Sequence, residues 1–226
     1  MIVLLICFFI FLYVLYYLSR DDFVIVRKDI SMERIFNLVF LTSIVSLFFS
    51  RLFFVLINSD PKLLSPLGFL AIPYFPGLSL VGGMLGAEFF IFLYGSFRKL
   101  PTGKVLDLFT LSFMATLPLG LIINFIINLG KVSFLSDLVF IFSIFILLLF
   151  AKIIYPFSNK GEIKDGSLGL IFGTIFSFLY FMAKLFLNLK GFSFLSLDNI
   201  LILVLLFSSL ILLVNQEIMD KFLAKK

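Results

Sequence analysis

The stretch IFNLVFLTSIVSLFFSRLFFVLI, residues 35–57, decides the fold class of this chain. Its only charged side chain is Arg51. A helix that crosses the hydrocarbon core of a bilayer needs about 20 mostly apolar residues, so this stretch predicts a transmembrane helix. Six further stretches have the same character. The expected spans are therefore residues 2–18, 35–57, 78–97, 106–128, 135–155, 167–187 and 197–214.

The composition of the whole chain agrees with this interpretation. Of its 226 residues, 62% are hydrophobic and 14% are charged, whereas about a quarter of a soluble domain is charged. Such a chain cannot bury its apolar side chains in one water-soluble core, and it is too apolar to be intrinsically disordered. The sequence predicts a single integral membrane domain over residues 1–226, an all-α polytopic protein with seven transmembrane helices.

The connection between the second and third spans is rich in proline. Residues 58–77 contain Pro61, Pro66, Pro73 and Pro76, and proline interrupts a regular helix because it lacks the backbone N–H. We expect an extracytoplasmic loop here that dips into the membrane surface.

The basic residues predict the orientation of the chain. Thirteen of the 18 Lys and Arg residues fall in the connections after the first, third and fifth spans or in the C-terminal tail, and five fall on the other side. The positive-inside rule then places the N-terminus outside and the C-terminus in the cytoplasm. A cleaved signal peptide is a weaker interpretation of the first span, because no basic residue precedes it and Ile6 is too large for the position before a processed Cys7.

Residue counts exclude several kinds of chemistry. The chain has no His and one Cys, Cys7, so histidine-based catalysis, histidine metal sites and an intrachain disulfide are excluded. We expect no metal and no cofactor. The net charge of +5 comes from short loops without a basic run, and we attribute it to membrane topology, with no nucleic acid as a partner.

Polar residues within the spans are the first candidates for function, because a charge at mid-bilayer costs about 2.5–3.5 kcal/mol or more. Arg51, Asn124 and Lys184 fall at a similar depth in the second, fourth and sixth spans, followed by Asn128 and Asn188. Two cations and an amide suit an anionic lipid headgroup. The alternative is that Arg51 and Lys184 extend to the interface by snorkelling.

The third span carries both an acidic residue and a cluster of small residues. Glu88 has no partner at helical spacing on its own span. Ser79, Gly82, Gly83 and Gly86 allow close backbone approach. They form either a wall against a lipid ligand or an ordinary tight contact between helices.

Four stretches in order resemble motifs of the prolipoprotein diacylglyceryl transferase family. SRLFFVL (50–56) resembles its A-R-L-x-Y-V-L, and GLSLVGGMLG (77–86) resembles G-[LM]-S-[IF]-H-G-G-L-I-G. GLIINFI (120–126) resembles the signature G-R-x-G-N-F-I-N, and YFMAKL (180–185) resembles Y-G-x-x-R-F. The resemblance covers about 31–190.

The resemblance implies a seven-span enzyme of the bacterial cytoplasmic (inner) membrane. It would transfer the diacylglyceryl group of phosphatidylglycerol to the cysteine thiol of a prolipoprotein, with the prolipoprotein signal-peptide region as its protein partner. Carried over by motif, the substrate-binding residues are Arg51, Ser79, Gly82 and Gly83, and the catalytic residues are Asn124 and Lys184.

The chain departs from the family at three functional positions. The family's His falls at Val81, its signature Arg at Leu121 and its second essential Arg at Lys184. Two hypotheses stay open. Either Lys184 and Arg51 stabilise the leaving phosphate of an active transferase, or the chain is a non-catalytic relative that binds lipid or a partner protein in the same groove. A transporter is a weaker third interpretation, because no inverted repeat is evident.

Overall fold

The computed structural model describes residues 2–70, 72, 74, 77–127, 134–154, 163–187 and 195–219. Within these residues the regular structure is helical, and seven helices are long and apolar enough to cross a membrane. They are α1 (Ile2–Arg20), α3 (Met32–Asn58), α6 (Leu80–Arg98), α7 (Thr102–Ile127), α8 (Phe134–Leu149), α10 (Ser167–Leu187) and α11 (Leu197–Val214). The predicted fold class, a seven-helix multi-pass membrane protein, is confirmed.

Shorter elements extend or join these helices. A π-helical turn, η1 (Phe150–Ile154), continues α8, and a second, η2 (Asn215–Met219), continues α11. The single-turn helix α2 (Phe23–Arg27) follows α1. It begins where it does because Asp22 Oδ1 accepts hydrogen bonds from the backbone N–H groups of Val24, at 3.0 Å, and Ile25, at 3.3 Å.

The proline-rich connection contains two short helices, α4 (Pro61–Leu64) and α5 (Pro66–Leu70). Each begins at a proline, the helical position at which a missing N–H costs least. Neither is long enough to span a membrane, so the absence of a regular spanning helix is confirmed for this part of the described chain. Pro73 and Pro76 lie outside the described residues.

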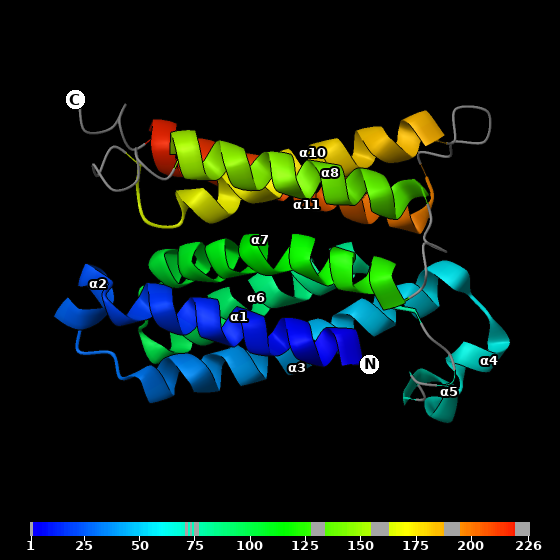
Figure 1. Cartoon of the computed structure of the whole chain (residues 1–226), viewed down its shortest axis with the longest axis horizontal. Coiled ribbons are helices and arrows are strands. Elements are labelled where there is room, and N and C mark those ends of the chain that lie inside the picture. Colours follow the sequence, from blue (N-terminus) through cyan, green and yellow to red (C-terminus); the bar gives the residue numbers. More distant parts are fainter. Residues whose placement is uncertain are drawn as a thin grey trace.

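The seven long helices run along one common axis and alternate in direction (Figure 1). In that view α3, α7 and α10 end on the right, whereas α1, α6, α8 and α11 end on the left. The first helix therefore begins at the opposite end of the bundle from the end of the last one, as an odd number of crossings requires.

Two apolar clusters form the interior. One gathers α1, α2 and α3 with the second half of α6 and the first half of α7, around Leu15, Leu38 and Ile91. The other gathers the first half of α6 with α8, α10, α11 and the second half of α7, around Phe176 and Ile202. Helix α6 thus contributes to both clusters, and its middle lies where the two meet.

Helices α3 and α6 form an antiparallel pair with small residues at the contact. Ser46 Oγ donates to the Gly83 carbonyl oxygen at 2.9 Å, and Ser50 Oγ donates to the Ser79 carbonyl oxygen at 2.8 Å. A Cβ atom on Gly86 would lie 2.6 Å from Phe49 Cβ. Small residues are what allow two membrane helices to approach this closely.

Candidate functional site

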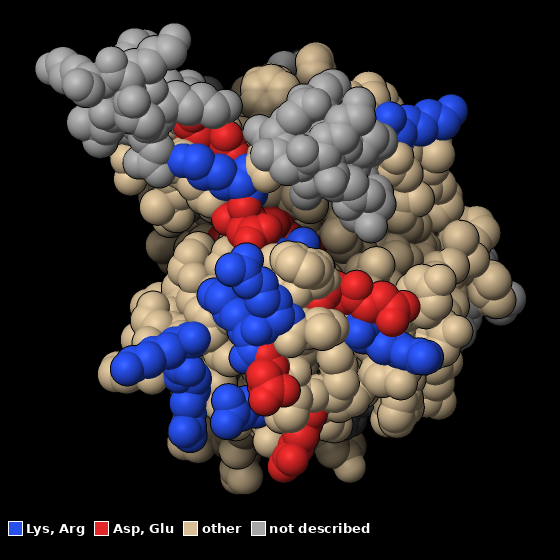
Figure 2. All heavy atoms as spheres, turned by 90° about the vertical axis from the view of Figure 1, so that its left-hand side faces the viewer, with Lys and Arg blue, Asp and Glu red and all other residues tan. Residues whose placement is uncertain are grey.

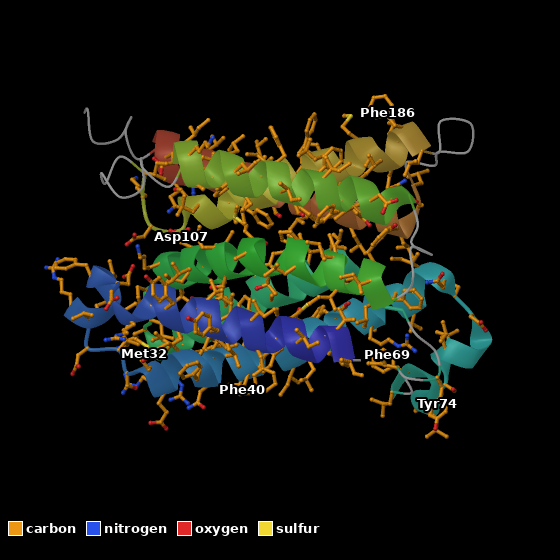
Figure 3. All side chains as sticks on the ribbon, viewed as in Figure 1. Met32, Phe40, Phe69, Tyr74, Asp107 and Phe186 are labelled. Carbon is orange, nitrogen blue, oxygen red and sulfur yellow. The ribbon has the colours of Figure 1, made fainter. Side chains whose placement is uncertain are left out.

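Arg51 is bound to the backbone of the proline-rich connection. Its side chain is 1% exposed, and its guanidinium donates to the carbonyl oxygens of Phe69 (Nε, 3.0 Å), Gly77 (Nη1, 2.9 Å) and Gly68 (Nη2, 2.9 Å). The ring of Phe54 lies 5.6 Å from its Cζ atom. Arg51 therefore does not snorkel to the membrane surface. It holds the segment of Phe69, labelled in Figure 3, against the end of α3.

Ser79, Gly82 and Gly83 lie at the start of α6, directly beside this anchor. Ser79 caps α6, since its Oγ accepts the Gly82 N–H at 3.1 Å, and its own N–H donates to the Ser50 carbonyl oxygen at 3.0 Å. Gly83 and Gly82 pack against α3. The contacts of these three residues are those of a tight helix pair, which is one of the two interpretations of the glycine cluster. Ser79 follows Gly77, a partner of Arg51, by two residues in the sequence.

Lys184 is paired with an acid that sequence reasoning did not single out. Its Nζ forms an ion pair with Asp198 Oδ2, and the two side chains are 15% and 28% exposed. The Nζ atom also lies 5.5 Å from the centre of the Tyr180 ring. Asp198 is in the first turn of α11, where a negative charge is favourable to the helix dipole. Its place at the start of a span, level with the cation at the end of the preceding span, was the signal that could have revealed it.

Asn124 is half-buried near the end of α7. Arg51, Asn124 and Lys184 all belong to the C-terminal parts of helices that end on the same side of the bundle (Figure 1). The partners of Arg51 lie in the proline-rich connection, and those of Lys184 lie on α10 and α11. That the three residues line one cavity stays a prediction. Asn128 and Asn188 lie outside the described residues.

The positions at which the family carries His and Arg are apolar here and share one cluster. Val81 is 2% exposed, and it belongs to the cluster of Phe176 and Ile202, against which Leu121 and Leu185 also pack. The segments that resemble the family's second, third and fourth motifs therefore meet in this cluster. A polar side chain at Val81 would have to enter an apolar interior.

At the opposite end of the bundle, Asp107 and Glu217 bind the start of α10, a contact that the sequence did not predict and that we call the polar clasp. Asp107 of α7, labelled in Figure 3, is 2% exposed and accepts the N–H groups of Gly166, at 2.7 Å, and Gly169, at 3.0 Å. Glu217 of η2 accepts the Lys164 N–H at 2.9 Å and the Ser167 hydroxyl at 2.6 Å. The start of α10 is thereby fixed to α7 and to the end of α11.

Charged side chains of both signs are scattered over this same end of the molecule (Figure 2). Lys104 at the start of α7 pairs with Asp22 at 3.0 Å, and Arg20 lies 3.8 Å from Asp21. Such interspersed charges suit a membrane–water interface.

Comparison with known proteins adds no relative to this picture. No family model, no curated protein and no solved structure matches the chain.

Proposed function

We propose that this chain binds phosphatidylglycerol at the bundle end that carries Lys184 and Asp198, and transfers its diacylglyceryl group to the cysteine thiol of a prolipoprotein. The observation that carries the proposal is the Lys184–Asp198 ion pair between α10 and α11. It places a cation and a proton acceptor together at one depth of the bundle. The motif resemblance supplies the reaction type.

The reaction needs two groups with opposite tasks. The thiol proton passes to the Asp198 carboxylate, the thiolate sulfur attacks the glyceryl carbon next to the phosphate, and the carbon–oxygen bond breaks with its electron pair on glycerol phosphate. Protonation of Asp198 frees Lys184 from its partner. The ammonium then stabilises the leaving phosphate, so that proton transfer and charge stabilisation occur at the same pair.

The membrane orientation belongs to the same proposal. The excess of Lys and Arg on one side of the predicted spans places the N-terminus outside a bacterial cytoplasmic membrane and the C-terminus inside. Lys184 and Asp198 are then in the outer leaflet, the side on which a prolipoprotein cysteine emerges after translocation.

A second candidate, a non-catalytic relative that binds lipid or a partner protein, is favoured by two observations. Val81 and Leu121 leave the apolar cluster without the family's His and signature Arg. Arg51 is already bound to three carbonyl oxygens. The chain thus lacks the family's His and signature Arg, and the guanidinium of Arg51 is occupied by backbone carbonyl oxygens. An active transferase of the family would use such groups on its substrate.

One experiment separates the two candidates. Purified protein in phosphatidylglycerol-containing vesicles is incubated with a peptide that carries a lipoprotein signal region, and the mass of the peptide cysteine is measured. A diacylglyceryl mass shift that is lost in Lys184→Ala and kept in Lys184→Arg supports the transferase. The matched control is Lys152→Ala, since Lys152 is exposed in η1 at the other end of the bundle.

Asp198→Asn sharpens this test. It removes the competing charge beside Lys184 and also the proton acceptor. We expect this variant to retain phosphatidylglycerol more tightly than the parent and to lose transfer by about a hundredfold or more, the scale of general acid–base catalysis. A parent chain that binds phosphatidylglycerol through Lys184 but modifies no peptide would reject the enzyme and leave the lipid-binding relative.

A further inference from the structure

Glu88 lies near the middle of α6, at the level where the two apolar clusters meet. Among the described residues no hydrogen bond or ion pair reaches its carboxyl group. An ionised carboxylate at this depth costs about 2.5–3.5 kcal/mol or more when it has no partner. The group therefore needs a positive species, either a proton of its own or a cation.

The neighbours of Glu88 come from α10 and α11. A Cβ atom built on Gly173 of α10 would lie 3.7 Å from Glu88 Oε1 and 3.6 Å from Ser209 Oγ of α11. The carboxyl group and the serine hydroxyl thus approach the same glycine from two different helices. Because Gly173 carries no side chain, both groups can lie close to its backbone.

The hydroxyl groups of Thr174 and Ser209 make more hydrogen-bond contacts than they have hydrogens to donate. Ser209 Oγ donates to the Leu206 carbonyl oxygen at 3.1 Å, Thr174 Oγ1 donates to the Leu170 carbonyl oxygen at 2.8 Å, and the two hydroxyl oxygens lie 3.0 Å apart. Each hydroxyl has one hydrogen and two lone pairs. Three contacts thus share two hydroxyl hydrogens, and the hydroxyl oxygens keep lone pairs that can accept a further hydrogen. A protonated carboxyl group at Glu88 would supply that hydrogen.

A second polar group at this depth also lacks a partner. Ser50 bonds to Ser79 and Ser46 bonds to Gly83 across the antiparallel α3–α6 pair. One further turn along each helix places Thr42 level with residue 87, next to Glu88 in sequence. Thr42 Oγ1 is buried and has no hydrogen-bond partner within the part of the chain that the structure describes. The Glu88 carboxyl group and the Thr42 hydroxyl group thus both lie near the middle of the bundle without a hydrogen-bond partner among the described residues.

We propose that Glu88, together with the hydroxyl groups of Thr174 and Ser209, forms a proton-binding site in the middle of the membrane, at the junction of α6 with α10 and α11. The ligand is a proton, held as the neutral acid that donates to a hydroxyl oxygen. The site is independent of the proposed transferase.

The charged groups on the surrounding helices lie away from this site, and most of them have partners at the ends of the bundle. They are Arg51 on α3 with its carbonyl oxygens, Lys104 and Asp107 on α7 with Asp22 and the start of α10, and Lys184 on α10 with Asp198 on α11. Glu33 and Arg34 are exposed in the first turn of α3, and Arg98 ends α6. These residues belong to the two ends of the bundle, whereas Glu88 is in the middle.

A hydrophobic carbodiimide tests the proposal on the full chain in vesicles. The protonated acid adds to dicyclohexylcarbodiimide: its proton goes to one nitrogen, its oxygen to the central carbon, and an acyl shift gives a stable N-acylurea with no atom lost. We expect peptide mapping to find this adduct at Glu88, with labelling that slows several-fold from acidic to alkaline pH. Glu88→Gln should give no adduct in that peptide. Glu33, which is exposed at the start of α3, should instead react with a water-soluble carbodiimide and an added amine.

Two further arms make the outcome decisive. Removing both hydroxyls, with Thr174→Val and Ser209→Ala, should raise the labelling rate several-fold at acidic pH, where the acid stays protonated, because its proton then has no acceptor that competes with the carbodiimide. Unchanged labelling would overturn their role in the site. Absence of the Glu88 adduct while exposed carboxyl groups react would overturn the proposal. So would protection by sodium or lithium at constant pH and ionic strength, because the ligand would then be a metal cation.

Discussion

Arg51 and Gly77, which are 26 positions apart in sequence, are joined by a 2.9 Å hydrogen bond from Nη1 to the glycine carbonyl oxygen. With the bonds to Phe69 and Gly68, it fastens the proline-rich connection to the end of α3. The guanidinium offers a fixed fork of donors, so one side chain satisfies carbonyl groups from two parts of the connection. The residue that the sequence assigned to a lipid phosphate thus has a positioning role.

The first prediction concerns this anchor. Arg51→Met leaves three carbonyl oxygens without their donor, and each buried unsatisfied group costs about 1–3 kcal/mol. We expect faster hydrogen exchange and proteolysis within residues 59–70, measured by mass spectrometry in detergent. Arg34→Met, at an exposed position in the first turn of the same helix, is the control. Equal protection in the two variants would contradict the anchor.

The second prediction compares two glycines of α6. A Cβ atom on Gly86 would lie 2.6 Å from Phe49 Cβ, an atom tied to the backbone, whereas one on Gly83 would lie 3.3 Å from Ser46 Oγ. We expect Gly86→Ala to lower the thermal unfolding midpoint clearly, with an overpacking cost of about 1–3 kcal/mol. Gly83→Ala should have the smaller effect. Equal midpoints would show that α3 and α6 do not pack as described.

The third prediction concerns the clasp at Asp107. Asp107→Ala removes the acceptor of two buried backbone N–H groups, and we expect a loss of about 2–6 kcal/mol in the free energy of unfolding, twice the cost of a single buried group without its partner. Asp107→Asn keeps one acceptor oxygen and should lose roughly half as much. Hydrogen exchange at Gly166 and Gly169 should rise in the same order. If exchange is unchanged in Asp107→Ala, these two amides are not held by the carboxylate.

The fourth prediction is the membrane orientation. In a Cys7→Ser background, a cysteine introduced at Asp60 should react with an impermeant thiol reagent in intact cells, and one introduced at Lys160 should react only after the membrane is opened. The reason is the excess of basic residues on the side of Lys160. The reversed pattern would refute the orientation, and with it the outer-leaflet position of Lys184.

The spans themselves could be predicted because membrane thickness fixes the length of an apolar stretch. Residues 167–187 and 197–214 coincide with α10 and α11, and the second span, 35–57, lies inside α3. The partners of the polar residues could not be predicted. Hydropathy gives the depth of Arg51 or Lys184 but not the rotation of each helix about its axis, and this rotation decides whether a cation meets a carbonyl group, an acid or lipid.

The motif resemblance had the same limit. It aligns the family's His and signature Arg with Val81 and Leu121, but only packing shows that these two residues share an apolar cluster. Since Val81 is 2% exposed among apolar side chains, we expect Val81→His with Leu121→Arg to lower stability.

The proposed transferase and a lipid-binding relative both require that Lys184 bind an anionic lipid, and equilibrium lipid retention tests this requirement most directly. Detergent-purified protein is titrated with phosphatidylglycerol or phosphatidylcholine, and bound lipid is counted by native mass spectrometry. We expect preferential retention of phosphatidylglycerol, weakened about tenfold or more in Lys184→Ala, which corresponds to about 1.4 kcal/mol, and unchanged in Lys152→Ala. Equal retention of the two lipids, or equal retention of phosphatidylglycerol by the parent and Lys184→Ala, would contradict the account.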